Sequence, residues 1–369
     1  MKGSGGKVIC MTADAVGGVW QYALELGAQL TERGCRVTLA LLGPAPSPEQ
    51  REQALAIPGL QLEETGQDLD WLADGPRPVR QAAREIAALA ERVQADIVHC
   101  NSPALAGAAE FSAPVVSVAH GCLSTWWSAA RSEPLPERFA WHHDMVKRGF
   151  AASDAVVAPS VSFAEIVQRT YRLPGRPHVV HNGRRPLVPD HSGSQSPVQA
   201  LTVGRLWDEV KNAALLDKVA SGLDMHFLAV GAVRGPNHET FAPDHLQVRG
   251  QLGETELAAL LERRPIFVSA ASFEPFGLAV LEAAAAGCPL VLSDIPTFRE
   301  LWDGAALFAD PADAESFTAA IRKVAGDAQL AASLGRAACE RAGRYTPAAS
   351  AKEMQRIYRR VLAGEREAA

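Results

Sequence analysis

The stretch Ser269–Gly287, SAASFEPFGLAVLEAAAAG, decides how the rest of the chain is interpreted. Its apolar start predicts a buried strand over Pro265–Ala271, followed by a tight loop and a helix that begins near Gly277. Pro275 favours such a helix start, because its φ angle is already helical and its missing N–H group costs nothing there. The sequence therefore predicts a strand–loop–helix unit, which is the local structure of many ligand sites.

The predicted loop and helix start combine hydrogen-bond donors with carboxylates. The N–H groups of Phe276, Gly277 and Leu278 would lack acceptors within the helix, and such a terminus attracts phosphate. Gly277 has no Cβ, so a ligand can approach the backbone closely. Glu274 and Glu282 stand eight positions apart. An ordinary explanation also exists, in which Glu274 favours the positive end of the helix dipole and Glu282 is a surface residue.

Length and composition indicate a soluble protein of two domains. The chain has 369 residues, 47% hydrophobic and 21% charged, and its net charge of −6 gives no reason to expect a nucleic-acid partner. No apolar run reaches the roughly 18–20 residues that span a bilayer, and the N-terminus lacks the apolar core of a signal peptide. The cysteines show no CxxC spacing, so we expect reduced core thiols in a cytoplasmic protein: Cys10, Cys35, Cys100, Cys122, Cys288 and Cys339.

Short apolar runs alternate with helical patterns along the whole chain, which predicts parallel sheets covered by helices. The pattern stops in the Pro-, Ser- and Gly-rich segment PLVPDHSGSQSP and then resumes. We expect an N-terminal Rossmann-like domain at 1–186, a linker at 187–197 and a C-terminal Rossmann-like domain at 198–345. A last helix within 346–369 would pack back on the first domain. The simplest architecture that fits this pattern is two such domains facing a central cleft.

Candidate ligand-binding residues follow the predicted strands of the first domain. Gly17 and Gly18 come after the first strand, where glycines let a phosphate or sugar approach a helix start. A plain glycine turn explains them equally well, and the dinucleotide fingerprint GxGxxG is absent. His120 follows the strand at 114–119 and would face the ligand edge of the sheet, although a lone histidine is often structural.

Further candidates follow the first strand of the second domain. Arg205 offers a planar fork that matches phosphate oxygens, and Lys211 adds a compact positive charge six positions later. Such cations suit a diphosphate, although they could also be surface residues paired with Asp208 and Glu209. Together with a helix N-terminus and carboxylates that bind vicinal diols, they describe a site for a nucleotide sugar.

These residues together resemble the retaining glycosyltransferases of family 4, which have the GT-B fold. The resemblance covers most of the chain and is strongest over the second half. The family's E-x7-E signature stands here as EPFGLAVLE, Glu274 to Glu282, and the segment VGRLWDEVKN at Val203–Asn212 matches its Gly-Arg-Leu…Lys loop.

The resemblance implies a role for each matching residue. Arg205 and Lys211 would bind the donor diphosphate and stabilise it as it leaves, so that no metal cofactor is needed. Glu274 would hold hydroxyls of the donor sugar and Glu282 the ribose. The remaining donor-side matches are backbone or base contacts and a histidine that touches the donor sugar: Gly18 beside Gly17, Phe276, Gly277, Leu278, Leu252 and His120.

The resemblance implies a hexosyltransferase of polysaccharide or glycoconjugate biosynthesis, with a UDP-sugar favoured as donor. The acceptor would be a glycan, a lipid-linked molecule or a small molecule. The alternatives are a GDP-mannose-type donor, a GT-B epimerase or phosphorylase, and a nucleotide-sugar-binding module without catalysis. The pair Asp68 and Asp70 has the DxD form of metal-dependent transferases, but it lies in a polar early loop and we do not expect a metal there.

The acceptor side is less specified by sequence. Trp126 and Trp127 follow His120 and would either stack on an acceptor sugar or belong to the core. Arg77, Arg80 and Arg84 share one face of an amphipathic helix. They would be a solvated face or a weak peripheral contact with anionic lipid at the inner membrane.

Overall fold

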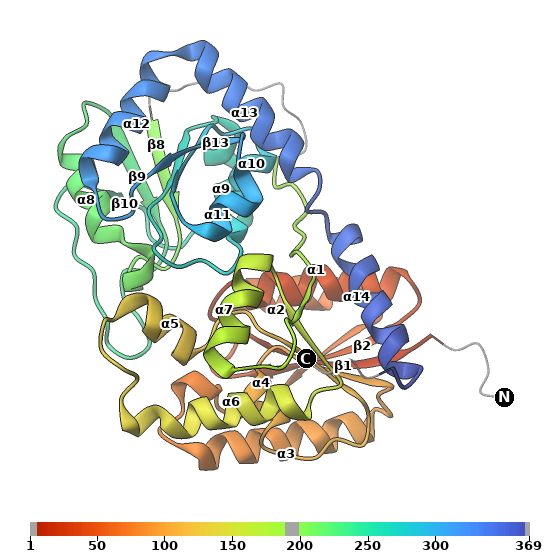
Figure 1. The fold of residues 1–369 in the computed structure, drawn as a ribbon. Coiled ribbons are helices and arrows are strands. Elements are labelled where there is room, and N and C mark those ends of the chain that lie inside the picture. The colour runs from red at the N-terminus through yellow and green to blue at the C-terminus, as the bar shows by residue number, and fades with distance from the viewer. Residues whose placement is uncertain (1–5, 189–198, 366–369) are drawn as a thin grey trace. The chain divides into compact units, whose positions relative to one another are not determined.

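The structure is a computed structural model that describes residues 6–188 and 199–365. The chain forms two compact units, unit 1 (Met1–Gly183 with Pro347–Ala369) and unit 2 (Arg184–Thr346). Each unit is a parallel sheet covered by helices, which confirms the prediction of two α/β domains (Figure 1). The division falls after Gly183, and most of the segment 187–197 expected as a linker lies outside the described residues.

Unit 1 has a doubly wound sheet with strand order β3-β2-β1-β4-β5-β6-β7. Its strands are β1 Val8–Asp14, β2 Arg36–Leu42, β3 Leu60–Glu64, β4 Ile97–Cys100, β5 Val115–Val118, β6 Ala155–Ala158 and β7 His178–Val179. Its helices are α1 Gly18–Glu32, α2 Pro48–Leu55, α3 Pro76–Arg92, α4 Pro103–Ala106, α5 Leu123–Ala130, α6 Ala140–Ala152 and α7 Val161–Tyr171. Single 3-10 turns occupy η1 Asp70–Leu72 and η2 Glu137–Phe139. The order reverses between β1 and β4, so the loops after these strands lie at the switch point where such sheets bind ligands.

The last helix, α14 (Pro347–Leu362), belongs to unit 1 and lies beside α1 (Figure 1). Its apolar face enters the same core as β1 and α1. The buried side chains that it contributes are Ala351, Met354, Ile357, Tyr358 and Val361. Unit 1 is therefore built from two separated stretches of the chain.

Unit 2 repeats the design with strand order β10-β9-β8-β11-β12-β13. Its strands are β8 Gln199–Val203, β9 His226–Val230, β10 Gln247–Val248, β11 Ile266–Ser269, β12 Leu290–Ser293 and β13 Ala306–Ala309. Its helices are α8 Ala213–Ser221, α9 Glu254–Glu262, α10 Leu278–Ala285, α11 Pro296–Trp302, α12 Ala314–Gly326 and α13 Ala328–Ala342, with a 3-10 turn η3 at Glu209–Lys211.

Helices cover both faces of the unit 2 sheet, as in buried parallel sheets generally. Alternate residues of β11 show this directly. Phe267 belongs to one apolar cluster, together with α10, whereas Ile266 and Val268 belong to another, together with α12. The strand order reverses between β8 and β11, which places the loops after these strands side by side.

The start of α10 lies within one residue of the predicted Gly277, but the residues before it are arranged differently from the prediction. The helix begins at Leu278, and Gly277 is its N-cap with φ 93° and ψ 67°, a left-handed conformation. Pro275 therefore precedes the helix instead of beginning it, and Phe276 lies outside the first turn. The predicted position of the helix start is confirmed. Pro275 and Phe276 lie before it because a helical φ at Pro275 does not determine the conformation of Gly277, which redirects the chain afterwards.

Candidate active site

Lys211 and Glu274 come together at the switch point of unit 2. Ala200 and Leu201 of β8 pair with Ile266 and Phe267 of β11, so the loops after the two strands are neighbours. The Ser272 N–H donates to the Val210 carbonyl oxygen at 2.9 Å, which ties one loop to the other. Lys211 Nζ lies 2.6 Å from Glu274 Oε2, and the side chains are 23% and 15% exposed. The structure thus joins two residues that the sequence places 63 positions apart.

Arg205 lies in the same loop as Lys211 and has a local partner. Its Nη2 donates to Asp208 Oδ2 at 2.7 Å, and its guanidinium lies 5.4 Å from the ring centre of Trp207. Asp208 is the partner that the surface explanation of the sequence proposed. The Arg205 side chain is 40% exposed, however, and a guanidinium has five N–H donors. Arg205 is therefore held in place by Asp208 and still presents donors to solvent.

The N-terminus of α10 follows the loop that carries Glu274, and Gly277 is its N-cap. An added Cβ at Gly277 would stand 3.2 Å from Phe298 Cε1, and the left-handed φ already disfavours other residues. The first-turn N–H groups from Leu278 onward have no acceptors within the helix. Phe276 is buried and its ring meets the edge of Tyr345 at 5.6 Å between ring centres, so its side chain serves packing.

Glu282 has a buried partner that the sequence analysis missed. Arg184 Nε donates to Glu282 Oε1, and Arg184 Nη2 donates to Glu254 Oε1, each at 2.7 Å. The Arg184 and Glu282 side chains are 3% and 10% exposed. Burial alone would lower the pKa of Arg184, but the charges of Glu282 and Glu254 raise that pKa above its usual value. The same contacts hold the pKa of Glu254 below its usual value, although burial acts the other way.

Arg184 could have been suspected from sequence by one signal. A pair of arginines, Arg184 and Arg185, stands shortly after the apparent last strand of the first domain. Nothing in local periodicity tells which of them is buried. The structure shows that the Arg185 side chain is 62% exposed, while still reaching Glu254 at 3.0 Å.

Leu252, predicted to contact the base, is partly buried and packs against the unit 2 core cluster that contains Leu281. It directly precedes the N-cap of α9, Gly253. Gly250 nearby has a left-handed φ of 72°, with open space where a Cβ would stand. The open space at this turn therefore lies at Gly250, two positions before Leu252 in the segment that the resemblance matches to the base-contacting turn.

The glycines of unit 1 lie at the start of α1, as predicted. Gly17 is the N-cap, with extended φ and ψ angles of −154° and −151°, and Gly18 is the first, exposed residue of the helix. In the loop before them, Val16 N–H donates to Asp14 Oδ1 at 2.9 Å. The loop after β1 is therefore held by its own aspartate.

His120 takes part in a network of polar groups at the edge of the unit 1 sheet. Its Nε2 lies 2.8 Å from Asn101 Oδ1, and the same oxygen lies 3.1 Å from His99 Nε2. The Tyr22 ring meets the His120 ring edge-on, at 4.4 Å between centres. Burial lowers the pKa of His120 to about 3 and that of His99 to about 4, so both imidazoles are neutral at physiological pH.

A pocket opens beside His120 on unit 1. Its walls come from the loops after β1, β4 and β5 and from the turn η1: Thr12, Ala13, Asp14, Val19, Leu42, Leu69, Asp70, Trp71, Asn101, Ser102, Pro103, His120, Gly121 and Cys122. Among these described residues there is no lysine or arginine, whereas Asp14 and Asp70 supply carboxylates. The pocket therefore combines hydroxyl-binding groups with apolar walls and lacks a cation for an anionic ligand.

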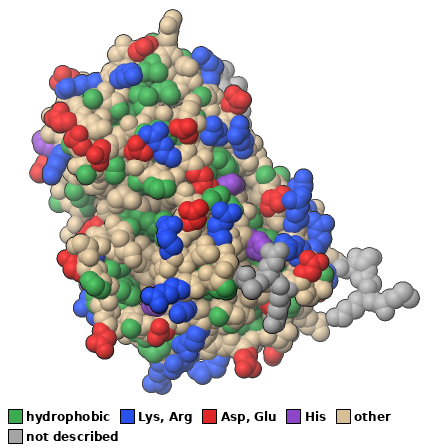
Figure 2. Space-filling model, viewed as in Figure 1, with side chains coloured by type: hydrophobic (Ala, Val, Ile, Leu, Met, Phe, Trp, Pro, Cys, Tyr) green, Lys and Arg blue, Asp and Glu red, His purple; other side chains and the backbone are tan. Residues whose placement is uncertain are grey.

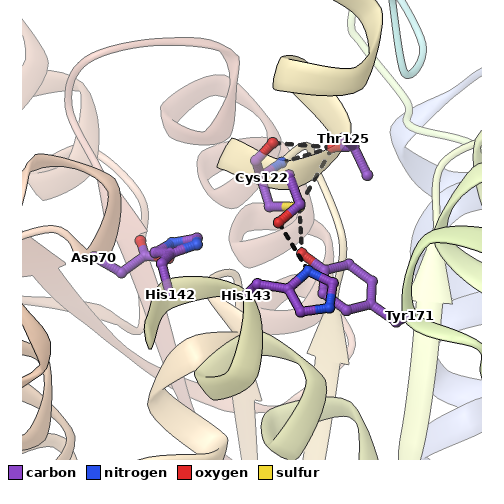
Figure 3. A network of polar contacts seen from close by, with 7 residues as sticks. Asp70, Cys122, Thr125, His142, His143 and Tyr171 are labelled. Carbon is purple, nitrogen blue, oxygen red and sulfur yellow. Dashed lines mark hydrogen bonds and ion pairs between the residues drawn. The ribbon is translucent and has the colours of Figure 1, made fainter. Parts of the chain in front are cut away.

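Two polar contacts support the walls of this pocket (Figure 3). His142 Nε2 lies 2.9 Å from Asp70 Oδ2, and this contact keeps the pKa of Asp70 below its usual value, although burial acts to raise it. Cys122 Sγ lies 2.9 Å from Tyr171 Oη, and burial raises the pKa of the Cys122 thiol. The ring of His143 stacks on Tyr171, at 4.8 Å between centres. Asp70 is thus a fixed carboxylate, and Cys122 is a protonated thiol.

The structure separates the carboxylates of the DxD sequence. Asp68 is exposed, whereas Asp70 is buried against His142. Within residues 6–188 and 199–365, no group of three or more His, Cys, Asp or Glu side chains is arranged to hold a metal ion.

Trp126 and Trp127 lie on α5 and are partly buried. Their rings meet edge-on at 6.3 Å between centres, and the guanidinium of Arg131 lies over both, at 5.3 and 5.6 Å. Trp127 Nε1 also donates to the Glu133 carbonyl oxygen at 2.9 Å. The tryptophans therefore form a local cluster with Arg131 instead of entering the core.

Charged side chains of both signs lie on the exposed face shown in Figure 2. Arg77, Arg80 and Arg84 are exposed on α3. Acidic and basic side chains are interspersed over the face shown in Figure 2. Among the helices of the described residues, none is both long and apolar enough to cross a membrane.

Sequence comparison assigns both halves of the chain to glycosyltransferases. Residues 16–186 match the family described as Glycosyltransferase Family 4, and residues 190–341 match Glycosyl transferases group 1. The chain is 29% identical over 316 residues to a glycogen synthase of Mycobacterium tuberculosis, covering 78% of this chain and 69% of the relative. It is 28% identical over 378 residues to a phosphatidyl-myo-inositol mannosyltransferase of Mycolicibacterium smegmatis, covering 96% and 93%.

Solved structures share the fold at low identity. A sucrose-phosphate synthase from Thermosynechococcus elongatus superimposes with a TM-score of 0.77 at 18% identity, over 97% of this chain and 100% of the other. Anabaena HepE, solved in complex with UDP and glucose, gives a TM-score of 0.70 at 14% identity, over 95% and 98%. The matches of both halves, the relatives and the shared architecture agree, and the chain is a glycosyltransferase of the family 4 type with the GT-B fold.

Proposed function

We propose that this glycosyltransferase transfers a hexose from a nucleoside-diphosphate sugar, with retention at the anomeric carbon and without a metal ion. The observation that carries the proposal is the junction of Lys211 and Glu274 at the switch point of unit 2, next to the N-terminus of α10. A cation, a carboxylate and free helix-start donors suit a ligand that joins a diphosphate to a polyhydroxylated ring.

Each residue then has a chemical task. Lys211 and Arg205 bind the diphosphate and stabilise its charge as the bond to the anomeric carbon breaks. The first-turn N–H groups of α10 bind the same phosphates. Glu274 exchanges part of its contact with Lys211 for hydroxyls of the donor sugar. Glu282, whose Oε1 is held by Arg184, binds the ribose diol.

The acceptor attacks on the face that the diphosphate leaves, and a phosphate oxygen takes its proton. This route needs no enzymatic nucleophile, which suits a Glu274 that is already held by Lys211. It differs from retaining glycosidases, where a second carboxylate attacks the anomeric carbon.

The favoured donor is a UDP-sugar. The structural neighbour solved with UDP and glucose supports a uridine nucleotide, whereas the mannosyltransferase relative keeps a mannose donor of the GDP-mannose type as the second candidate. In this proposal the base contacts the turn that carries Gly250 and Leu252.

The unit 1 pocket favours an uncharged acceptor. Asp14 and Asp70 would repel a phosphate or carboxylate, and the described lining offers no lysine or arginine to offset them. Hydroxyl groups, in contrast, can donate to both carboxylates, and Trp71 gives a surface for a sugar ring. We infer that the group entering this pocket is a neutral sugar of a glycan or glycoside. A cytoplasmic location, and a weak contact of α3 with anionic lipid, remain part of the proposal.

The donor is tested by thermal unfolding in the presence of UDP, GDP and ADP, followed by mass spectrometry of products from the matching nucleotide sugars. A nucleotide at 100 times its dissociation constant should add about 2.7 kcal/mol to the free energy of unfolding. We expect UDP to give the largest shift and a UDP-sugar to be consumed. A larger shift with GDP would select the second candidate.

Variants test the assignment of the site. Lys211→Ala and Glu282→Ala should each abolish turnover, whereas Lys218→Ala, which removes an exposed lysine of α8, should not change it. Full activity in the Lys211→Ala, Glu282→Ala double variant would refute the proposed site. UDP binding without sugar release would indicate a binding module. An altered nucleotide sugar without acceptor would indicate an epimerase, and consumption of inorganic phosphate a phosphorylase.

The acceptor class is tested separately, with methyl hexosides and their 6-phosphates as acceptors. The neutral hexosides should be used at least tenfold better, and Asp70→Asn should narrow that difference. A preference for the phosphorylated acceptors would exclude the neutral-sugar assignment.

A further inference from the structure

Tyr358, on the last helix of the chain, reaches the polar network that holds His120. Its Oη lies 2.6 Å from His99 Nδ1, and the two side chains are buried, at 5% and 0% exposure. His99 lies on β4, and its other ring nitrogen contacts Asn101. The hydroxyl of Tyr358 is thus connected to His120 through two side chains.

The orientation of the Asn101 amide fixes where the protons of this network lie. Asn101 Nδ2 donates to the Thr12 carbonyl oxygen at 2.6 Å, and a carbonyl oxygen can only accept. The other end of the amide is therefore the oxygen Oδ1, which also can only accept. Its partners at 3.1 and 2.8 Å, His99 Nε2 and His120 Nε2, must both carry hydrogen.

The same logic extends to Tyr358. A neutral His99 with hydrogen on Nε2 has a lone pair on Nδ1, and the Tyr358 hydroxyl donates to it. His120 with hydrogen on Nε2 likewise keeps its Nδ1 as an acceptor. His120 lines the unit 1 pocket, so this nitrogen is the group with which the ring can accept a hydrogen bond from a sugar hydroxyl.

A competing arrangement shows why Tyr358 matters. If the Asn101 amide turned over, both histidines would have to move their hydrogen to Nδ1. His120 would then lose its acceptor at that nitrogen. In this arrangement His99 Nδ1–H would face Tyr358, whose oxygen would have to accept instead of donate. The bond from Asn101 to the Thr12 carbonyl opposes the change at one end. Tyr358 opposes it at the other, because a phenol hydroxyl donates to a neutral ring nitrogen more strongly than it accepts from a ring N–H.

We propose that Tyr358 is a positioning residue for His120: acting through His99 and Asn101, its hydroxyl holds His120 in the form that accepts a hydrogen bond from a substrate hydroxyl. The role in turnover rests on the proposed glycosyl transfer. The proton arrangement itself does not, because it is a property of the protein without substrate. The C-terminal helix thereby contributes to the site as well as to the core.

Nitrogen-15 spectra of the full-length protein labelled at histidine test the proton arrangement directly. The unmodified protein should show His99 and His120 neutral, with hydrogen on Nε2. Tyr358→Phe should shift the ring nitrogens of both residues and add a population of His120 with hydrogen on Nδ1. Ile357→Val is the control, because it removes a buried methyl group from the same helix and core without touching the network. An unchanged His120 in Tyr358→Phe would overturn the proposal, whether or not the enzyme is active.

Kinetics test the consequence for the reaction. Tyr358→Phe should lower kcat about tenfold, while the dissociation constant of UDP stays within about twofold, because the side chains proposed to bind the diphosphate and the ribose, such as Lys211 and Glu282, belong to unit 2. Ile357→Val should leave kcat within about twofold. If the His120 tautomer shifts and kcat is unchanged, Tyr358 has no role in turnover. Absence of turnover in the unmodified protein with any nucleotide sugar would refute the proposed function and leave the spectroscopic result standing.

Discussion

Arg184 and Arg185 are neighbours in sequence and have opposite environments. Both contact Glu254, but Arg184 is buried and also holds Glu282, whereas Arg185 is exposed. A buried ion pair that loses one partner leaves an uncompensated charge, while an exposed pair contributes little. Substitutions at these two neighbouring positions therefore compare the effect of losing a buried contact in the site with the effect of losing an exposed one.

Arg184→Met should destabilise unit 2 by roughly 3–5 kcal/mol, because Glu282 and Glu254 lose their buried counter-charge. It should also raise the dissociation constant of UDP, because Glu282 is no longer oriented. Arg185→Met should cost less than about 1 kcal/mol and leave UDP binding unchanged. Urea unfolding and UDP titration measure both quantities. Equal effects of the two substitutions would contradict the assigned role of Arg184.

His99 should make the protein sensitive to acid. Its pKa falls from an ordinary 6.5 to about 4 on folding, because burial disfavours the charged ring. Between these values the unfolded chain binds the extra proton and the folded chain does not, so stability falls as the pH falls. From pH 7 to pH 5 this residue alone should remove about 2 kcal/mol from the free energy of unfolding.

The measurement is urea unfolding at pH 7 and pH 5 for the unmodified protein and for His99→Gln. The variant should be less stable at pH 7 but should show a shallower pH dependence. His120, whose pKa is also lowered, acts in the same direction and should preserve part of the slope. An identical slope in the two proteins would show that His99 is not held neutral.

At the scale of elements, α10 depends on the left-handed Gly277. Gly277→Ala would force an unfavourable φ and place a Cβ 3.2 Å from Phe298. Gly304 offers a matched control, since its φ is 78° but nothing lies within 4 Å of an added Cβ. Gly304→Ala should cost roughly 1–2 kcal/mol through backbone strain alone. Gly277→Ala should cost more and weaken UDP binding at least tenfold, because the helix start moves. Unchanged UDP binding would exclude the N-terminus of α10 from the nucleotide site.

The elements that the sequence predicted well are those with strong periodicity. The buried strands β5 and β11, predicted at 114–119 and 265–271, were placed to within two residues, because apolar spacing records burial directly. The short helices α4, α5 and α11 were missed. Each has eight residues or fewer, so its apolar period alone is weak evidence for a helix. The equally short α10 was predicted because Pro275 and Gly277 also mark its start.

In the candidate site, too, sequence predicted some contacts and missed others. Sequence could bring Lys211 and Glu274 into one hypothesis, because strand ends of a parallel sheet gather ligand residues. It could not show that Arg184 belongs with Glu282, since nothing local marks a buried arginine 98 positions away. Nor could it connect Tyr358 with His99, which are separated by 259 positions and meet only because α14 returns to unit 1.

At the scale of the whole molecule, the chain passes from unit 1 to unit 2 and back at neighbouring points. The Arg184 N–H donates to the Tyr345 carbonyl oxygen at 3.2 Å, so the residues that begin and end unit 2 lie side by side. Unit 2 is therefore a continuous insertion between the two parts of unit 1. Because α14 follows unit 2 in the chain, it is synthesised last, and unit 1 is complete only after unit 2 has been synthesised.

This organisation predicts how the units behave when separated. Residues 184–346 should fold alone, because their core clusters use no residue from outside that range. Residues 1–183 should not, because they lack Met354, Ile357, Tyr358 and Val361 of α14. Burial of four such side chains is worth roughly 6–12 kcal/mol, at about 1.5–3 kcal/mol each, which is comparable with the whole stability of a domain.

Joining residues 1–183 directly to 347–369 through a short glycine linker should restore a folded unit 1, because the two crossing points are adjacent. Circular dichroism and urea unfolding of the three fragments measure the outcome. In the joined fragment, Met354→Ala should cost about 2–5 kcal/mol, since this side chain is fully buried in the shared core. A cooperative unfolding transition for residues 1–183 would contradict this prediction, because it would show that unit 1 folds without α14. The contacts from Tyr358 to His120 would then come from a helix that unit 1 does not need in order to fold.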